Sequence, residues 1–308
     1  MNTSPIKVFG HQSPDTDATC SAIVWAWFLS TQRQTPATAY VLGTPNTEAG
    51  FVLDYWNVSH PELLTTISSQ DSVSIVDTNN VDELFPNIND CNIISIIDHH
   101  KLTGGLKTST PLEVVIQPYA STMTVMFNIM NIEPTDFPRE IAGLMLSGIL
   151  SDTLEFRSPT ITDTDKALAQ QLAEALDIDT AEYAQRMFAA KSDISHFSDQ
   201  ELLRLDSKVY DLKGIQTRVA VLETTDPTSV LARKNTLMQS MATVAADDAV
   251  DQVILFVIDI LQEEATVLIP NETVRELIEK GFGVATSGDT YVLPGVVSRK
   301  KQIVPALS

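Results

Sequence analysis

The sequence predicts an α/β protein with an N-terminal doubly wound parallel sheet and a smaller C-terminal α+β domain with a mixed sheet. Three observations favour this class. The 308 residues exceed the size at which a single core usually stops growing. Short β-like runs alternate with helical segments in the first half, as parallel sheets require. Two β-like runs follow each other near residue 260 without a helix between them, which indicates a strand pair.

The apolar pattern assigns each expected element a range. In the first half the expected strands are 6–10, 39–42, 73–76 and 93–97, and the expected helices are 18–30, 47–56, 121–130, 138–150 and 163–176. In the second half the expected strands are 208–211, 215–222, 253–260 and 265–269, and the expected helices are 227–246 and 271–280. The polar stretch 191–195 is the expected linker, which gives a domain over 1–190 and another over 196–308.

Composition excludes several classes of function. The formal net charge is -20 at pH 7, so we expect no nucleic-acid partner, because binding to a polyanion depends on Lys and Arg. No apolar stretch is long enough for a membrane span, and we expect no membrane association. The two cysteines form no metal or disulfide pattern, which favours a reducing, cytoplasmic location.

Histidines and aspartates follow the apolar runs that we expect to be strands. His99 and His100 come directly after Asp98, at the end of the run 93–97, and His11 follows the run 6–9. The carboxyl edge of an open α/β sheet is where binding sites form. We therefore expect these side chains to share one site.

Four further aspartates occupy similar positions. Asp15 and Asp17 lie in the loop after His11, where they could equally cap the next helix. Asp77 follows the run 72–76, and Asp152 follows the apolar segment 141–150; each taken singly is typical of a turn or a helix end. The recurrence of the pattern, rather than any single residue, indicates a site.

Imidazole and carboxylate groups without thiolates indicate a divalent cation. Carboxylates favour Mg²⁺ or Mn²⁺, and imidazole adds affinity for Mn²⁺, Co²⁺, Fe²⁺ or Zn²⁺. The set is His11, Asp15, Asp17, Asp77, Asp98, His99 and Asp152. Seven groups exceed the needs of one ion, whereas two ions bridged by a carboxylate could clamp the oxygens of a phosphoryl transfer.

Five motifs, in order along the chain, resemble the family II, manganese-dependent inorganic pyrophosphatases of the DHH phosphoesterase superfamily. They are HQSPDTD at 11–17, Asp77, DHH at 98–100, Ser151-Asp152-Thr153 and SRKKQ at 298–302. The DHH motif alone would indicate only the superfamily, which also contains exonucleases and cyclic-dinucleotide phosphodiesterases. The SRKKQ segment is the more specific element.

The resemblance implies a role for each residue. One ion would be held by His11, Asp15 and Asp77, and a second by Asp17, Asp77, His99 and Asp152. Asp77 would bridge the ions, Asp98 would orient a ligand histidine, and His100 would lie close to a substrate oxygen. Lys208 would bind phosphate together with Arg299 and Lys300, whereas His60 and His196 match no motif.

The implied reaction is hydrolysis of diphosphate to two orthophosphates by a water or hydroxide activated by two Mn²⁺ per subunit. Co²⁺ is an alternative metal, and Mg²⁺ would arrive with the substrate. The active site would lie in a cleft between the two domains. The resemblance also implies a homodimer. The rival functions are a short-chain exopolyphosphatase, another DHH-family phosphodiesterase and a non-catalytic metal- or phosphate-binding regulator. The tail reads Gly281-Phe-Gly-Val, without the Gly-Gly-Gly-His motif typical of such phosphodiesterases.

Overall fold

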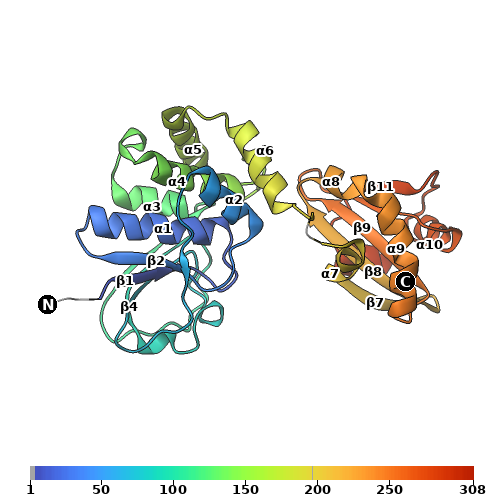
Figure 1. Ribbon diagram of the computed structural model, residues 1–308, viewed down its shortest axis with the longest axis horizontal. Coiled ribbons are helices and arrows are strands. Elements are labelled where there is room, and N and C mark those ends of the chain that lie inside the picture. Colours follow the sequence, from blue (N-terminus) through green and yellow to red (C-terminus); the bar gives the residue numbers. More distant parts are fainter. Residues whose placement is uncertain (1–3, 196) are drawn as a thin grey trace. The chain divides into compact units, whose positions relative to one another are not determined.

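The computed structural model describes residues 4–195 and 197–308 and divides the chain into two compact units (Figure 1). The first is Met1–Ala190 and the second is Lys191–Ser308. His196, which we expected near a helix start after the linker, lies outside the described residues. Each unit is described by itself.

The first unit contains a six-stranded sheet in the order β3-β2-β1-β4-β5-β6, and its neighbouring strands pair in parallel. Its strands are β1 (Ile6–Phe9), β2 (Ala37–Val41), β3 (Glu62–Leu63), β4 (Ser72–Val76), β5 (Asn92–Asp98) and β6 (Glu113–Ile116). The strand order reverses direction between β1 and β4. Such a switch point leaves a crevice at the carboxyl ends of the strands, where ligands bind.

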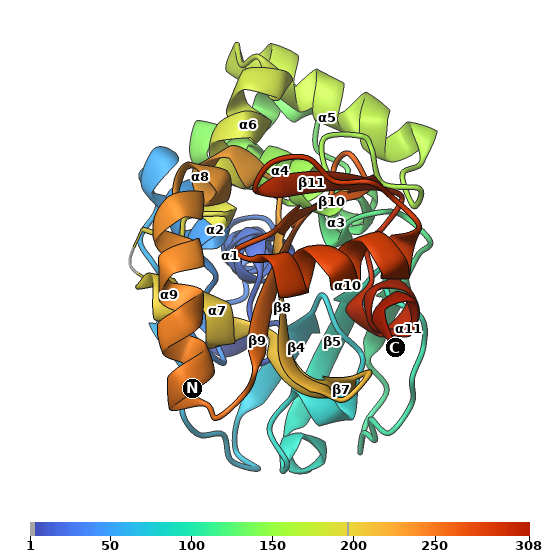
Figure 2. The same cartoon turned by 90° about the vertical axis from the view of Figure 1, so that its right-hand side faces the viewer.

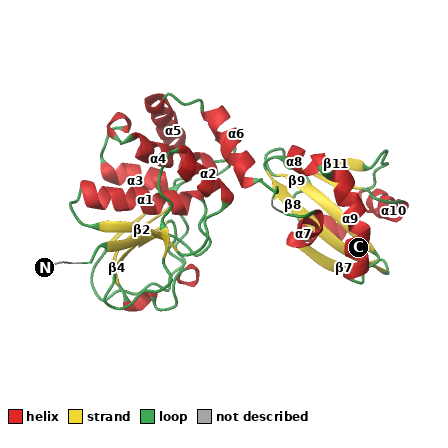
Figure 3. Cartoon of the chain, in the orientation of Figure 1, coloured by secondary structure: helices red, strands yellow, loops and turns green. Residues whose placement is uncertain are grey.

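Helices cover one side of this sheet, and segments with short 3₁₀ helices cover the other (Figure 3). The α-helices are α1 (Thr16–Thr31), α2 (Thr47–Tyr55), α3 (Thr122–Met130), α4 (Arg139–Asp152), α5 (Asp163–Leu176) and α6 (Thr180–Lys191). On the opposite face, Phe9, Val73 and Ile75 pack with Leu84 and Ile88 from the 3₁₀ segments. The predicted α/β class is confirmed, and the helices of the first unit gather mainly on one face.

The second unit is built on a five-stranded mixed sheet in the order β11-β10-β9-β8-β7. Its strands are β7 (Ser207–Leu212), β8 (Ile215–Thr224), β9 (Gln252–Asp259), β10 (Glu264–Leu268) and β11 (Thr290–Pro294). Only the β8–β9 pair is parallel among the pairings described, so the predicted mixed sheet is confirmed.

Two helical layers sandwich this mixed sheet (Figure 2). The helices are α7 (Asp199–Leu205), α8 (Pro227–Ala232), α9 (Lys234–Asp247), α10 (Glu272–Phe282) and α11 (Val304–Leu307), and a π-helical turn spans Arg299–Ile303. Leu202 of α7 and Leu237 of α9 belong to one core cluster. Leu277 of α10 and Leu307 of α11 belong to the other, so each face of the sheet has its own core.

The structure departs from the expected elements at several points. The helix expected at 227–246 is two helices that meet at Arg233, whose guanidinium binds Asp199 and the carbonyl oxygens of Ile194 and Phe197. Helix α1 begins at Thr16, because Asp15 caps it by accepting a hydrogen bond from Ala18 N at 3.0 Å. Within the described ranges, no helix has the length and apolarity needed to cross a membrane.

Candidate metal centre

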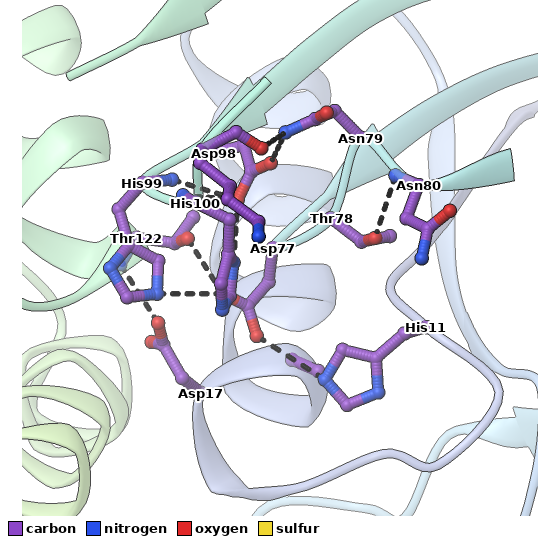
Figure 4. A network of polar contacts seen from close by, with 12 residues as sticks. His11, Asp17, Asp77, Thr78, Asn79, Asn80, Asp98, His99, His100 and Thr122 are labelled. Atoms are coloured by element: carbon purple, nitrogen blue, oxygen red, sulfur yellow. Dashed lines mark hydrogen bonds and ion pairs between the residues drawn. The ribbon is translucent and has the colours of Figure 1, made fainter. Parts of the chain in front are cut away.

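The expected ligands converge where three neighbouring strands end (Figure 4). His11 follows β1, Asp77 follows β4, and His99 follows β5, and these strands are adjacent in the sheet. Asp17 enters from the first turn of α1 and Asp152 from the last residue of α4. Parallel pairing therefore places residues far apart in sequence at a single edge, as the strand-end pattern predicted.

The first cluster consists of His11, Asp15 and Asp77, each offering a ligand atom within 4.8 Å of the others. Nε2 of His11 lies 3.6 Å from Oδ2 of Asp77 and 3.8 Å from Oδ1 of Asp15. Asp15 is also the N-cap of α1. The capping alternative and the ligand role are therefore compatible, because the cap fixes the direction of the carboxylate.

The second cluster consists of Asp17, His99 and Asp152, again within 4.8 Å of one another. Nε2 of His99 lies 3.6 Å from Oδ2 of Asp152 and 3.5 Å from Oδ1 of Asp77. The two oxygens of Asp77 thus face different histidines, Oδ2 toward His11 and Oδ1 toward His99. This is the geometry that a carboxylate shared between two cations requires.

Several negative charges are confined in this small volume. Burial, followed by the charge of Asp77, raises the pKa of Asp17 to about 7, and burial with neighbouring carboxylates raises the pKa of Asp152 well above its usual range. Burial alone would lower the pKa of His99, but contact with Asp77 and the charge of Asp17 raise it to about 9. A divalent cation would relieve this repulsion, and the imidazole and carboxylate donors fit Mn²⁺.

The N-terminus of α3 holds two of the buried carboxylates. Asp17 accepts hydrogen bonds from Ser121 Oγ at 3.0 Å and from Thr122 N at 2.8 Å, while Thr122 Oγ1 donates to Asp77 Oδ1 at 2.8 Å. The partial positive charge of a helix N-terminus adds to these bonds. Ser121 and Thr122 were not predicted as site residues, although a Ser-Thr pair at the start of an expected helix is a signal for such a role.

Asp77 itself has a strained backbone. Its φ is 56°, in the left-handed region, although its amide still donates to Ile97 O at 2.9 Å and so continues the sheet pairing. Aspartate tolerates this region better than most residues, and strain of this kind gathers at functional sites. The turn directs the carboxylate between the two histidine-containing clusters.

Asp98 has a different partner from the one expected. Its Oδ1 accepts hydrogen bonds from His100 Nδ1 at 2.9 Å and from the backbone amides of His99 and His100. The ring of His99 instead lies 3.1 Å from Tyr119 O through Nδ1. The expectation that Asp98 orients the ring of a ligand histidine is therefore wrong for His99. The reason is that the tight turn after β5 brings the ring of His100, and not that of His99, back onto Asp98.

His100 lines a polar pocket of about 510 Å³ beside the first cluster. His11, Asn79 and Lys101 also line it. Asn79 is buried, donates to Asp98 Oδ2 at 2.6 Å and accepts a hydrogen bond from Thr103 N at 2.8 Å. Asn79 belongs to none of the sequence motifs. It fixes the Asp98 carboxylate, which in turn accepts a hydrogen bond from the ring of His100.

In the second unit, Asp206 links Arg299 to the start of the strand that carries Lys208. Arg299 contacts Asp206 through both terminal nitrogens, with Nη2 2.7 Å from Oδ1 and Nη1 2.7 Å from the backbone oxygen. Asp206 directly precedes β7, which carries the exposed Lys208. Lys300 is exposed on the same turn as Arg299.

Comparison with known proteins places these features in a family. The model for the DHH family, N-terminal domain, matches residues 5–149, and the DHHA2 domain model matches residues 185–308. A Bacillus subtilis protein named as a manganese-dependent inorganic pyrophosphatase is 37% identical, over 98% of this chain and 97% of its own. The chain belongs to the family of manganese-dependent inorganic pyrophosphatases.

Two further relatives support membership of this pyrophosphatase family. A Deinococcus radiodurans relative, whose name places it in the same family, is 38% identical over 98% of this chain and 97% of its own. A crystal structure from Methanococcus jannaschii, described as a family II inorganic pyrophosphatase, is 32% identical, with a TM-score of 0.61 and 98% of each chain covered. The predicted resemblance to the family is confirmed.

Gly148 of α4 tests the packing of this pyrophosphatase-type metal centre. A Cβ added there would lie 2.6 Å from Asp17 Oδ1 and 2.8 Å from Met123 Cγ. We expect Gly148→Ala to displace Asp17 and to lower the Mn²⁺ affinity of the metal-free protein by about 10- to 100-fold, as loss of outer support does at other metal sites. Isothermal titration calorimetry with Mn²⁺ measures the effect.

Gly50→Ala in α2 is the matched control. An added Cβ there has His60 Cε1, at 4.0 Å, as its nearest neighbour, so it fits without displacement. Replacing a helical glycine should stabilise α2 by up to about 1 kcal/mol and leave Mn²⁺ affinity unchanged. Equal affinities for the Gly148 and Gly50 variants would show that Asp17 does not depend on this close packing.

Proposed function

We propose that this protein is an inorganic diphosphatase that hydrolyses diphosphate to two orthophosphates with manganese as its metal. The observation that carries the proposal is the carboxylate of Asp77, which offers one oxygen to each of two ligand clusters. Full-length relatives at 37–38% identity carry the corresponding name, which supports the choice of substrate. Hydrolysis forms one P–O bond from water and breaks the bridging P–O bond.

We further propose two Mn²⁺ sites in each chain. His11, Asp15 and Asp77 would hold one ion, and Asp17, Asp77, His99 and Asp152 would hold the other. When bound, such ions supply Lewis-acid charge that neutralises phosphoryl oxygens and makes water a better nucleophile. Co²⁺ as a substitute and Mg²⁺ brought by the substrate complete the metal proposal, since carboxylate and imidazole donors accept both kinds of cation.

The remaining site residues would act on the substrate. His100 lines the pocket and is held by Asp98, so it is placed to stabilise charge on a phosphoryl oxygen. Lys208, Arg299 and Lys300 would bind the phosphate groups, with Arg299 offering a planar fork and the lysines point charges. The expected cleft between the units stays a prediction.

We also propose a cytoplasmic location and a homodimeric assembly. The structure has Cys20 and Cys91 as free, buried thiols, which suits the cytoplasmic location that we propose. Homodimerisation is proposed from the resemblance to the family.

Product release from three substrates in parallel tests the function: orthophosphate is measured with diphosphate and tripolyphosphate, and mononucleotide with a dinucleotide, whose phosphodiester hydrolysis frees no orthophosphate. The protein is stripped with a chelator, reloaded with Mn²⁺, Mg²⁺ or Zn²⁺, and given diphosphate, tripolyphosphate or a dinucleotide. We expect fast release from diphosphate alone, highest with Mn²⁺, and loss of release after chelation. Preference for tripolyphosphate or for the dinucleotide would move the protein to one of the rival functions.

Asp77→Ala should abolish diphosphate hydrolysis, because it removes the ligand that both cations would share. The phosphate-release assay at saturating Mn²⁺ measures the loss. Asp54→Ala is the control: this exposed carboxylate pairs with His60 at 3.0 Å and should be dispensable. Near-normal turnover of the Asp77 variant would contradict the shared-ligand arrangement.

His100→Gln should lower kcat by about 100- to 1,000-fold, the usual effect of removing one donor that stabilises transition-state charge. Metal content should stay at two ions per chain, because His100 is half-exposed and its Nδ1 is engaged by Asp98. Metal analysis after gel filtration, alongside the kinetics, separates the two effects. If one ion were lost, His100 would be a metal ligand.

A further inference from the structure

Glu48 is a buried acid that none of the motifs includes. It lies in the first turn of α2, and its relative exposure is 0%. A carboxylate in such a place costs free energy unless hydrogen bonds compensate it. The protein must therefore compensate the free-energy cost of burying Glu48.

The partners of Glu48 belong to the segments that carry the metal ligands. Its Oε2 accepts hydrogen bonds from Thr16 Oγ1 at 2.8 Å and from Ser151 Oγ at 2.7 Å. Thr16 stands between Asp15 and Asp17, and Ser151 directly precedes Asp152. One oxygen atom thus joins the first residue of α1, which directly follows the metal loop of residues 11–15, to the end of α4.

The segment before Glu48 is itself fixed against the metal loop. Asn46 N donates to Pro14 O at 3.0 Å. Gly43 packs so closely that an added Cβ would lie 2.3 Å from Gln12 O. Asn46 also caps α2 by accepting a hydrogen bond from Ala49 N at 2.8 Å. Helix α2 is therefore held at a defined distance from the loop, and Glu48 with it.

We propose that Glu48 is a positioning residue of the metal centre, which fixes Asp17 and Asp152 at ligating distance through Thr16 and Ser151. Both aspartates must be ionised to ligate a cation, and their mutual repulsion in that state would move the start of α1 and the end of α4 apart if no brace held them. A cation would then have to bring the segments together, at a cost in affinity. The inference deepens the proposed function, because it concerns the same metal site.

The test is Mn²⁺ binding to metal-free protein, measured by isothermal titration calorimetry without substrate. We expect Glu48→Ala to lower Mn²⁺ affinity by about 10- to 100-fold, as at other sites that lose outer support. We expect Glu48→Gln to bind nearly as tightly as the unaltered protein, because both hydroxyls donate to a single oxygen that a glutamine carbonyl can replace. Glu272→Ala, an exposed first-turn glutamate of α10, should change nothing.

Three outcomes would overturn the inference. Unchanged affinity in Glu48→Ala would show that the brace is not needed. Equal losses in Glu48→Ala and Glu48→Gln would make the charge of Glu48, rather than its hydrogen bonds, the cause. A readout beyond affinity separates positioning from catalysis: at saturating Mn²⁺, kcat of Glu48→Ala should return close to that of the unaltered protein, and a persistent large loss of kcat would count against a role in metal placement.

If Glu48→Ala does not fold, as judged by thermal denaturation, Thr16→Val and Ser151→Ala carry the test. Each removes one hydroxyl donor and leaves the size of the side chain nearly unchanged, and each should weaken Mn²⁺ binding. Unchanged affinity in both would overturn the inference. Because the titration uses no substrate, failure to hydrolyse diphosphate would refute the proposed function and leave the result for Glu48 intact.

Discussion

Electrostatic repulsion among the aspartates at the carboxyl edge of the first sheet is the constraint that the structure around the site must meet. Asp17 and Asp77 are almost completely buried. Asp15 lies beside His11, and Asp152 lies beside His99. At about 4 Å two unit charges repel by roughly 4 kcal/mol where the effective dielectric constant is near 20. The fold holds these groups together only because hydrogen-bond donors surround them and because the strands that carry them are fixed by the sheet.

The surrounding helices supply those donors from chain segments remote in sequence. The start of α3 provides Ser121 and Thr122 for Asp17 and Asp77, and Gly148 of α4 leaves room for the Asp17 carboxylate. The same packing keeps Asp17 from moving away from its neighbours. Hydrogen bonds and packing within the protein thus fix these carboxylates in place, and side chains that need little rearrangement would bind a cation at a lower entropic cost.

The sequence predicted the cluster of histidines and aspartates but not the residues that support it, and the reason is physical. His11, Asp77 and His99 follow apolar runs directly, so local pattern and the parallel-sheet rule suffice to bring them together. The hydrogen bond between Asp17 and Ser121 joins residues 104 positions apart, and no local pattern announces it. Strands β3, β6 and β11, for which no strand was predicted, are outer strands of their sheets and have two, four and five residues, so each gives only a short local pattern.

Arginine placement shows how an acidic chain can still present cations to an anion. The net charge of -20 opposes an anionic substrate at long range, so attraction must be local. Arg299 is held by Asp206 through one carboxylate contact and one backbone contact, which fixes the plane of the guanidinium. Two of the five N–H donors are engaged in this way among the described contacts, and the fork keeps further donors that the proposed phosphate site would use. At that proposed site Asp206 would weaken the net charge, but it would also spare the entropy that a free arginine loses on binding, so that geometry rather than charge would carry the recognition.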